Sequence, residues 1–367
     1  MKYLSLSFLK KLALSGLVLV ILIVFAEIIL SALKIFPDDY FTMTPNSGFT
    51  WIINPDEIEG IQGDSEIAFD ALGARSISNI ENKEHKIAVF GGSTTACFAL
   101  SQERTWTALL EKKLGDKYWV GNFGRPGNSS NHHILQIDRI LDKPELNNVE
   151  TVLVMLGVND FVGYLVSSEQ YLHSSDTELQ KFAFQHTPPS KESSFRQKST
   201  VYRLMAKAKK KIKFYFSHQE YLTKTSDDIK AIKRKSETVD SLPSLTLGLE
   251  HYQKNIERII QLAKEKNIDL VFTTQATMWK PNLEEKYEKL LLTSGFKDNK
   301  KFYSTEAFYN GMRAFNERLI ATCKENNISY IDIEDLPKTT VSFYDDFHFN
   351  ESGAKLVSEK IYKGLKK

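Results

Sequence analysis

The chain has few cysteines, almost no net charge and no metal-binding pattern. Its 367 residues include two cysteines, Cys97 and Cys323, too few for a disulfide framework, so we expect two buried free thiols. A formal net charge of +2 gives no reason to expect nucleic acid as a partner. No H-E-x-x-H or similar ligand cluster occurs, and we predict neither a metal nor a cofactor. The 42% hydrophobic and 26% charged fractions are ordinary for a globular protein.

One long apolar run lies near the N-terminus. Residues 12–33 contain about 22 residues with one charge, enough to cross a hydrocarbon core. Lysines and the amino terminus precede the run, so the positive-inside rule predicts a cytoplasmic N-terminus and an extracytoplasmic remainder. A cleaved signal peptide is the alternative, but the run exceeds a usual h-region and no A-x-A site follows it. We therefore predict an uncleaved single-pass anchor in the cell membrane.

The single charge in this run is Glu27. It lies within two turns of the predicted outer end, so its side chain is expected to reach toward the lipid headgroups. A helix–helix contact inside the membrane is the alternative interpretation.

The rest of the chain divides by its sequence pattern. We predict an anchor over residues 1–34, a tether and lead-in over 35–84, and a catalytic domain over 85–367 with an insertion at about 166–245. Short apolar runs predict five strands, at Ile87–Phe90, Tyr118–Phe123, Thr151–Leu156, Leu270–Thr274 and Ser329–Ile333. Helical patterns between or after them cover Thr105–Leu114, His132–Leu141, Leu249–Lys266, Ala307–Asn326 and Glu351–Leu365. This alternation predicts a mostly parallel sheet that is covered on both faces.

The insertion is polar and carries a dense basic run over residues 206–216. Apolar side chains recur in it at helical spacing: Val201, Leu204, Met205, Ala208, Ile212 and Tyr215. One interpretation is a helix docked on the core with its lysines in solvent. The other is a basic amphipathic helix that rests on the membrane or on an anionic polymer.

Ligands of parallel sheets bind at the carboxyl ends of the strands, so the residues after each strand are the candidates for a site. The first strand ends in Gly91-Gly92-Ser93. A serine at the start of the next helix has backbone N–H groups and the helix dipole beside it, which would stabilise an oxyanion. An N-cap serine or a phosphate-binding turn would have the same local sequence.

Two further strand ends carry hydrogen-bond donors. Gly127, after the second strand, would let a backbone N–H approach a ligand that a β-carbon would obstruct. Asn159, after the third strand, supplies a neutral side-chain donor, and Asp160 is expected to cap the following helix.

The last strand is followed by Tyr344-Asp345-Asp346-Phe347-His348. A histidine can act as general base for a serine, and a carboxylate three residues earlier can orient its ring. Asp345 is the better candidate for this partner, because Asp346 is displaced by one residue and is expected to face another way.

These four blocks together resemble the SGNH hydrolases, also called the GDSL esterase/lipase family. The matching segments are GGSTT, NFGRPGNSS, GVND and DDFH, and the resemblance covers about residues 86–165 and 269–367. It implies a flavodoxin-like three-layer α/β/α sandwich with a five-stranded sheet. It also implies Ser93 as nucleophile, His348 as base and then acid, and Asp345 as the residue that orients His348. The implied oxyanion donors are the Ser93 and Gly127 amides and the Asn159 side chain.

The sequence departs from the family pattern in one place, because Gly92 replaces the aspartate of the family's name motif. The chain does contain a literal Gly63-Asp64-Ser65, but no apolar strand leads into it, so we assign it no catalytic role. His132 and His133 begin a helix beside the predicted site without metal-ligand spacing, and we expect structural roles for them, with contact to the substrate as the alternative.

The predicted function is an extracytoplasmic serine esterase that cleaves O-acyl esters, most simply O-acetyl esters, on a cell-envelope glycan or lipid-linked substrate. Envelope-biosynthesis proteins are further candidate partners. An O-acyltransferase with the same triad is the first alternative, and a non-catalytic envelope scaffold or glycan-binding protein is the second.

Overall fold

The computed structural model describes residues 6–33, 35–53, 58–189, 194–209, 237–291, 295–297 and 301–366. It has two compact units, residues 1–40 with 187–225 and residues 41–186 with 226–367, and each is described by itself. Ile212, Tyr215 and the basic run beyond Lys209 lie outside the described residues. The predicted boundaries after residues 34 and 84 stay predictions.

The larger unit is built on a five-stranded sheet with the order β10-β7-β5-β3-β4. Its strands are β3 (His85–Gly91), β4 (Tyr118–Asn122), β5 (Thr151–Met155), β7 (Asp269–Thr273) and β10 (Ser329–Ile331). All four pairings are parallel. Counted along the chain, this order is the 2-1-3-4-5 arrangement of flavodoxin-like folds. The predicted strands and the predicted fold class are therefore confirmed.

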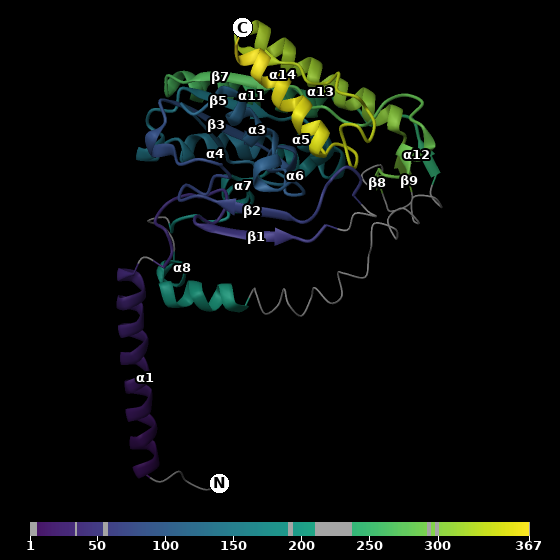
Figure 1. The fold of residues 1–367 in the computed structure, drawn as a ribbon. Helices are drawn as coiled ribbons and strands as arrows, with labels where there is room; N and C mark the ends of the chain where they lie inside the picture. Colours follow the sequence, from purple (N-terminus) through teal and green to yellow (C-terminus); the bar gives the residue numbers. More distant parts are fainter. Residues whose placement is uncertain are drawn as a thin grey trace. The chain divides into compact units, whose positions relative to one another are not determined.

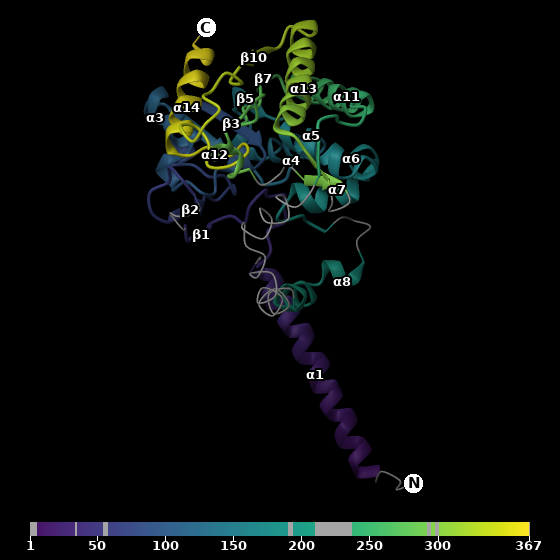
Figure 2. The same cartoon turned by 90° about the vertical axis from the view of Figure 1, so that its right-hand side faces the viewer.

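Helices cover both faces of this sheet. Figure 2 shows α3 (Trp106–Leu114) and α14 (Glu351–Leu365) on one side of the strands, and α4 (Ser130–Ile140), α11 (Thr246–Glu265) and α13 (Thr305–Glu325) on the other. The five predicted helices are thus present, with ends within three residues of those expected. Their apolar spacing explains the packing, since α11 buries Tyr252, Ile256, Ile259 and Ala263 along one stripe.

The central strands are buried on both faces, which is why their sequences are continuous apolar runs rather than alternating ones. In β3, Val89 and Phe90 are fully buried, and the Phe90 ring stacks on Phe123 with 5.4 Å between centroids. Trp106, at the start of α3, donates its indole N–H to the Thr94 carbonyl at 3.0 Å. The core therefore directly supports the turn that follows β3.

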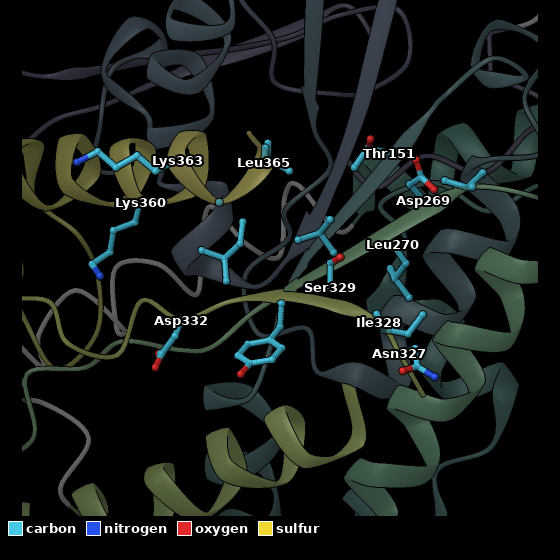
Figure 3. A pocket seen from close by; sticks show the side chains of 15 residues that line it. Thr151, Asp269, Leu270, Asn327, Ile328, Ser329, Asp332, Lys360, Lys363 and Leu365 are labelled. Carbon is cyan, nitrogen blue, oxygen red and sulfur yellow. The ribbon is translucent and has the colours of Figure 1, made fainter. Parts of the chain in front are cut away.

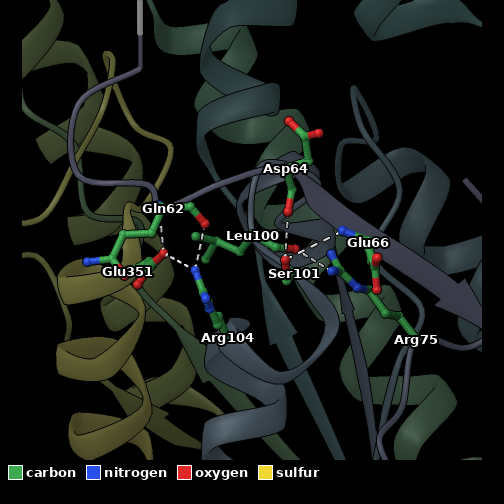
Figure 4. Close-up of polar contacts among 8 residues, drawn as sticks. All are labelled: Gln62, Asp64, Glu66, Arg75, Leu100, Ser101, Arg104 and Glu351. Atoms are coloured by element: carbon green, nitrogen blue, oxygen red, sulfur yellow. Dashed lines mark hydrogen bonds and ion pairs between the residues drawn. The ribbon is translucent and has the colours of Figure 1, made fainter. Parts of the chain in front are cut away.

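The lead-in forms an antiparallel hairpin of β1 (Ser47–Trp51) and β2 (Ser65–Phe69), both drawn in Figure 1. Figure 4 shows how the chain just before β2 is held on the domain. Arg104 donates to the Gln62 carbonyl at 2.7 Å and pairs with Glu351 at 2.6 Å. The Ser101 hydroxyl donates to the Asp64 carbonyl at 3.0 Å.

Shorter elements complete the larger unit. They are α2 (Ser93–Ala96), α5 (Val158–Val166), α6 (Ser168–His173), α7 (Asp176–Ala183), α12 (Glu285–Glu288), a small sheet of β6 (Glu237–Val239), β8 (Gly295–Lys297) and β9 (Lys301–Tyr303), and the 3-10 turns η1 (Ile80–Asn82), η2 (Gln102–Arg104) and η3 (Pro144–Leu146). Of these, α2, α5, α6 and α7 lie around the candidate site.

The smaller unit contains the long helix α1 (Leu6–Ala32), the turn α8 (Phe195–Lys198) and a helix over residues 200–209, named the insertion helix below. Within α1, Ala13–Ala32 is long and apolar enough to span a membrane. Length and composition alone do not distinguish an anchor from a signal sequence.

Candidate active site

The candidate site lies where the strand order of the sheet reverses. β3 is the first strand of this sheet along the chain and has β4 on one side and β5 on the other. In doubly wound sheets a crevice forms outside the carboxyl ends of the strands at this reversal. Ser93 follows β3 and Asn159 follows β5, so the topology brings these two segments together.

The turn after β3 is made of glycines because neighbouring groups occupy the space of a side chain. A β-carbon on Gly91 would lie 2.1 Å from the Thr95 hydroxyl, and one on Gly92 would lie 2.1 Å from the Asn159 side-chain nitrogen. Ser93 is then the first residue of α2, a helix that ends after one turn at Cys97, in the left-handed region with φ 49°.

Three of the predicted residues form one hydrogen-bonded chain. The Ser93 hydroxyl oxygen lies 2.7 Å from Nε2 of His348. Nδ1 of the same ring lies 2.7 Å from a carboxylate oxygen of Asp345. The other oxygen of Asp345 accepts from the backbone N–H groups of Phe347 and His348, at 3.0 and 2.9 Å. This geometry fixes the carboxylate and the ring relative to Ser93.

The electrostatic environment favours a proton on His348. Burial alone would lower the pKa of its imidazole, but the nearby carboxylates of Asp345 and Asp346 outweigh it and raise the pKa above the ordinary value of 6.5. Asp346 itself points elsewhere, because its carboxylate accepts from the Trp279 indole N–H at 2.9 Å. The two neighbouring aspartates therefore differ in what they contact, as expected from the sequence.

The loop that carries these residues is closed on itself. Phe343 and Phe349 form an antiparallel bridge, and the Tyr344 N–H donates to the His348 carbonyl at 3.1 Å. The Tyr344 ring stacks on the His348 ring with 5.5 Å between centroids and 10° between planes. The closed loop and the stacked ring restrict the orientation of the imidazole.

Backbone and side-chain donors face the same region from the other loops. Gly127 has φ +78°, so glycine is needed there for backbone conformation. Among the described residues other than its chain neighbours, no atom lies within 4 Å of the position of its missing β-carbon. Asn159 uses one side-chain N–H to donate to the Asn128 carbonyl at 2.8 Å, which leaves the second N–H for a ligand. Within the described residues, the Ser93 and Gly127 amides have no hydrogen-bond acceptor.

Asp160 is not the N-cap that the sequence predicted, because Gly157 is the N-cap of α5 and Asp160 is the third residue of this helix. Its buried carboxylate accepts from the amide and the hydroxyl of Ser130, at 3.0 and 2.5 Å, and from the Tyr171 hydroxyl at 2.9 Å. Burial raises the pKa of Asp160 to about 6, although these donors act in the opposite direction. Asp160 thus connects the loop of Asn159 to the first turn of α4 and to α6.

Arg125 is a positioning residue that the sequence analysis missed. Its guanidinium donates to the carbonyls of Phe182 and Thr42, at 2.6 and 2.8 Å, and to the Gln185 side chain at 3.1 Å. These contacts tie the loop of Gly127 to Thr42 and to the segment over 182–185. The only local signal was an arginine within the glycine-rich block, and its partners lie 57 or more residues away in the chain.

A cavity of about 160 Å³ adjoins the oxyanion side of the site. Its lining includes Gly127 and Asn159, together with Gly163 of α5, Gln170 of α6 and Phe182 of α7. His132 also borders it, and Nδ1 of this ring accepts from the Ser129 N–H at 3.1 Å. Burial lowers the pKa of His132 to about 3, so this ring is neutral and caps α4, in agreement with its expected structural role.

A second cavity lies at the amino ends of the strands. Figure 3 shows its lining, which includes Thr151 and Asp269 at the starts of β5 and β7, Ser329 at the start of β10, and Lys360 and Lys363 of α14. Its volume is about 990 Å³, but its lining contains none of the predicted site residues. Volume alone therefore does not locate the candidate site.

The other candidate motifs have different structural surroundings. Ser65 is buried in β2, and its hydroxyl has no hydrogen-bond partner in the part of the chain that is described. Over the same described residues, no group of three or more His, Cys, Asp or Glu side chains is arranged to hold a metal ion. Cys97 and Cys323 are buried free thiols.

Comparisons with known proteins identify a family for this chain. Residues 89–356 match the model of the GDSL-like lipase/acylhydrolase family. Similar solved structures include a member of the lipolytic protein G-D-S-L family from Veillonella parvula, at 14% identity over 77% of this chain and 99% of that one, with a TM-score of 0.40. Another is Axe2, an acetylxylan esterase from Geobacillus stearothermophilus, at 12% identity over 78% and 96%, with a TM-score of 0.40. No curated protein sequence matched the chain.

Proposed function

Because the chain belongs to the GDSL-like lipase/acylhydrolase family and is thereby an ester-hydrolysing serine hydrolase, we propose that Ser93, His348 and Asp345 are its catalytic triad. The observation that carries this proposal is the hydrogen-bonded chain from Asp345 through His348 to Ser93, with 2.7 Å at both side-chain contacts. Three donors for an oxyanion, from Ser93, Gly127 and Asn159, face the same region.

In the first half-reaction, the Ser93 oxygen attacks the ester carbonyl while His348 Nε2 takes the hydroxyl proton. The carbonyl oxygen becomes an oxyanion, to which the Ser93 and Gly127 amides and the second Asn159 N–H donate. His348 then gives its proton to the departing alcohol oxygen as the C–O bond breaks, and an acyl-enzyme is left. In the second half-reaction, a water molecule gives a proton to His348 as it attacks the acyl carbonyl. His348 then returns this proton to the Ser93 oxygen as the bond between the acyl carbon and Ser93 breaks, and the acid leaves.

The position of the 160 Å³ cavity supports its assignment to the acyl group. The leaving oxygen must lie beside His348, which protonates it. The cavity borders two proposed oxyanion donors, Gly127 and Asn159, and its lining includes no residue of the loop over 343–349, so we assign it to the acyl group rather than to the departing alcohol. A cavity of about 150 Å³ holds benzene. Short acyl groups, with about six carbons or fewer, are therefore the substrates that fit.

We place this chemistry outside the cytoplasmic membrane, with α1 as an anchor, because the lysines before the apolar run favour a cytoplasmic N-terminus. An enzyme at that position meets envelope glycans and lipid-linked intermediates. Their O-acetyl esters match the small acyl cavity, and they are the substrates that we propose.

The proposal is tested with the full-length protein in detergent and p-nitrophenyl acetate as substrate. Ser93→Ala should lower kcat by at least about 10³-fold, because the nucleophile is lost while the fold is kept. Ser65→Ala is the matched control from the literal Gly-Asp-Ser triplet and should keep wild-type turnover. Undiminished turnover by Ser93→Ala would refute the triad.

An acyltransferase with the same triad would share the acyl-enzyme and differ only in its acceptor. Mass spectrometry of an acetylated oligosaccharide, incubated with the protein and an unacetylated acceptor, distinguishes the two. Free acetate identifies a hydrolase, and an acetylated acceptor identifies a transferase. A non-catalytic scaffold would give neither product.

A further inference from the structure

Within the smaller unit, the carboxylate of Glu27 is bonded to a segment more than 170 residues away in the chain. It accepts from the backbone amides of Thr200 and Val201, at 2.6 and 2.9 Å, and from the Ser199 hydroxyl at 2.8 Å. These are the first amides of the insertion helix and the residue before it. A carboxylate at this position satisfies N–H groups that have no partner within their own helix.

Two more contacts join the same segments. The hydroxyls of Ser31 and Thr200 lie 3.0 Å apart, one turn of α1 beyond Glu27. The Arg203 guanidinium lies 4.2 Å from the centre of the Phe36 ring. An ionised or polar group in an apolar helix is costly unless it has partners, and here the insertion supplies them.

The insertion helix runs across the end of α1 rather than along it. In Figures 1 and 2 its ribbon lies beside the carboxyl-terminal end of α1 and runs in a different direction from α1. If α1 crosses a membrane, a helix in this orientation lies in the membrane plane. Glu27 precedes the end of α1 by five residues, or about 8 Å of helix. This is the depth at which interfacial helices bury their apolar faces, about 5–10 Å.

The side chains of the insertion helix fit such a position. Val201, Leu204, Met205 and Ala208 form one apolar stripe, and Met205 is 66% exposed. Phe195 in α8, just before the helix, is 83% exposed. Lys207 and Lys209 flank the stripe, where their long side chains reach the level of anionic headgroups.

We propose that residues 194–209 lie in the membrane interface, that the apolar stripe of the insertion helix contacts lipid, and that Glu27 of a retained anchor holds the first turn of this helix. A leader that is cleaved could not make these contacts, so the inference favours an anchor over a signal sequence. It rests on the proposed membrane location and is independent of the esterase chemistry, which the Ser93→Ala assay tests in detergent.

Cysteine crosslinking of the full-length protein in native membranes tests the contact with the anchor. Ser31→Cys with Thr200→Cys should form an intramolecular disulfide on mild oxidation, since the replaced oxygens lie 3.0 Å apart and Cys97 and Cys323 are buried. Ile29→Cys with Thr200→Cys is the matched control, because Ile29 lies on another face of α1. Adding Glu27→Leu should reduce the yield of the Ser31–Thr200 crosslink.

The crosslinked peptides and the intact mass of the chain are measured by mass spectrometry. A disulfide in the test pair but not in the control, on a chain with its N-terminus intact, supports the proposal. An intact chain without the disulfide, or a chain cleaved before residue 31, would overturn it. An unchanged yield with Glu27→Leu would overturn the role of Glu27.

Contact with lipid is measured separately, on the full-length protein in vesicles of phosphatidylethanolamine and phosphatidylglycerol. A fluorescent NBD probe on Met205→Cys should lose emission when nitroxide-labelled lipids are added, whereas the same probe on Lys207→Cys should lose emission to aqueous iodide. Equal iodide quenching at both positions would show that the apolar stripe does not contact lipid.

Discussion

The side-chain nitrogen of Asn159 lies 2.1 Å from the position that a β-carbon on Gly92 would occupy. Gly92 therefore leaves room for the Asn159 amide directly beside the residue that precedes Ser93, and it stands where the family's name motif has an aspartate. The glycine that departs from the family motif is thus in direct contact with Asn159, the proposed oxyanion donor.

We expect Gly92→Ala to displace the Asn159 amide and to lower kcat by about 10²-fold or more, the typical cost of losing one oxyanion donor. The thermal stability should change little, because the clash is with the end of a side chain. Steady-state hydrolysis of p-nitrophenyl acetate measures the effect. In an Asn159→Ala background the same substitution should cost almost nothing further, and an equal cost in both backgrounds would show that the effect does not pass through Asn159.

The pH dependence of kcat/KM reports the state of His348. The imidazole must be neutral to accept the Ser93 proton, and its pKa is raised above 6.5, so kcat/KM should rise with pH through an apparent pKa above that value. Asp345→Asn should move this rise in kcat/KM to lower pH and should reduce kcat by about 10⁴-fold. Asp346→Asn is the matched control. Its amide oxygen can still accept from the Trp279 indole N–H, so it should keep most of the activity, and similar losses of activity in both variants would contradict the assignment of Asp345.

The raised pKa of Asp160 makes its contribution to the free energy of unfolding depend on pH. Its folded-state pKa of about 6 lies above the ordinary value of 3.8, so the stability that it contributes is complete below pH 3.8 and is lost as the pH rises through 6. The destabilisation caused by Asp160→Asn should therefore be greater at pH 4.5 than at pH 7.5, by about 2 kcal/mol. Thermal melts of both proteins at both pH values measure this. A difference that is independent of pH would contradict the buried, protonatable carboxylate.

Gly163 offers a test of the acyl cavity. A β-carbon there would meet only the Tyr171 ring, at 3.7 Å, so a larger side chain would fill the cavity without a backbone clash. Gly163→Leu should lower kcat/KM for p-nitrophenyl butyrate relative to the acetate by roughly tenfold. Gly163→Ala should leave the ratio of the two substrates nearly unchanged. An unaltered ratio in Gly163→Leu would show that the acyl group binds elsewhere.

The strands and the residues at their ends could be predicted from the sequence because both depend on local patterns. A strand buried on both faces needs a continuous apolar run, as in Ile87–Phe90, and a parallel sheet brings such ends to one edge. The order of Ser93, Gly127, Asn159 and His348 along the chain therefore carried enough information to expect one site. The spacing of Asp345 from His348 likewise distinguished it from Asp346.

Contacts between distant segments could not be predicted in this way. The partners of Arg125 and Asp160 lie in other loops and helices, and nothing in the local sequence distinguishes a capping aspartate from one that connects two loops. The need for glycine at position 127 was attributed to space, whereas its φ of +78° is the structural requirement. Glu27 gave a similar difficulty, since the pairing with Thr200 depends on the folded insertion.

Covalent labelling of the full-length protein with a fluorophosphonate, followed by intact-mass measurement and peptide mapping, tests the central claim most directly. The account predicts one adduct per chain, located on Ser93, and no adduct in Ser93→Ala. An adduct on Ser65 or another serine, or the absence of any adduct on the wild-type protein, would contradict it.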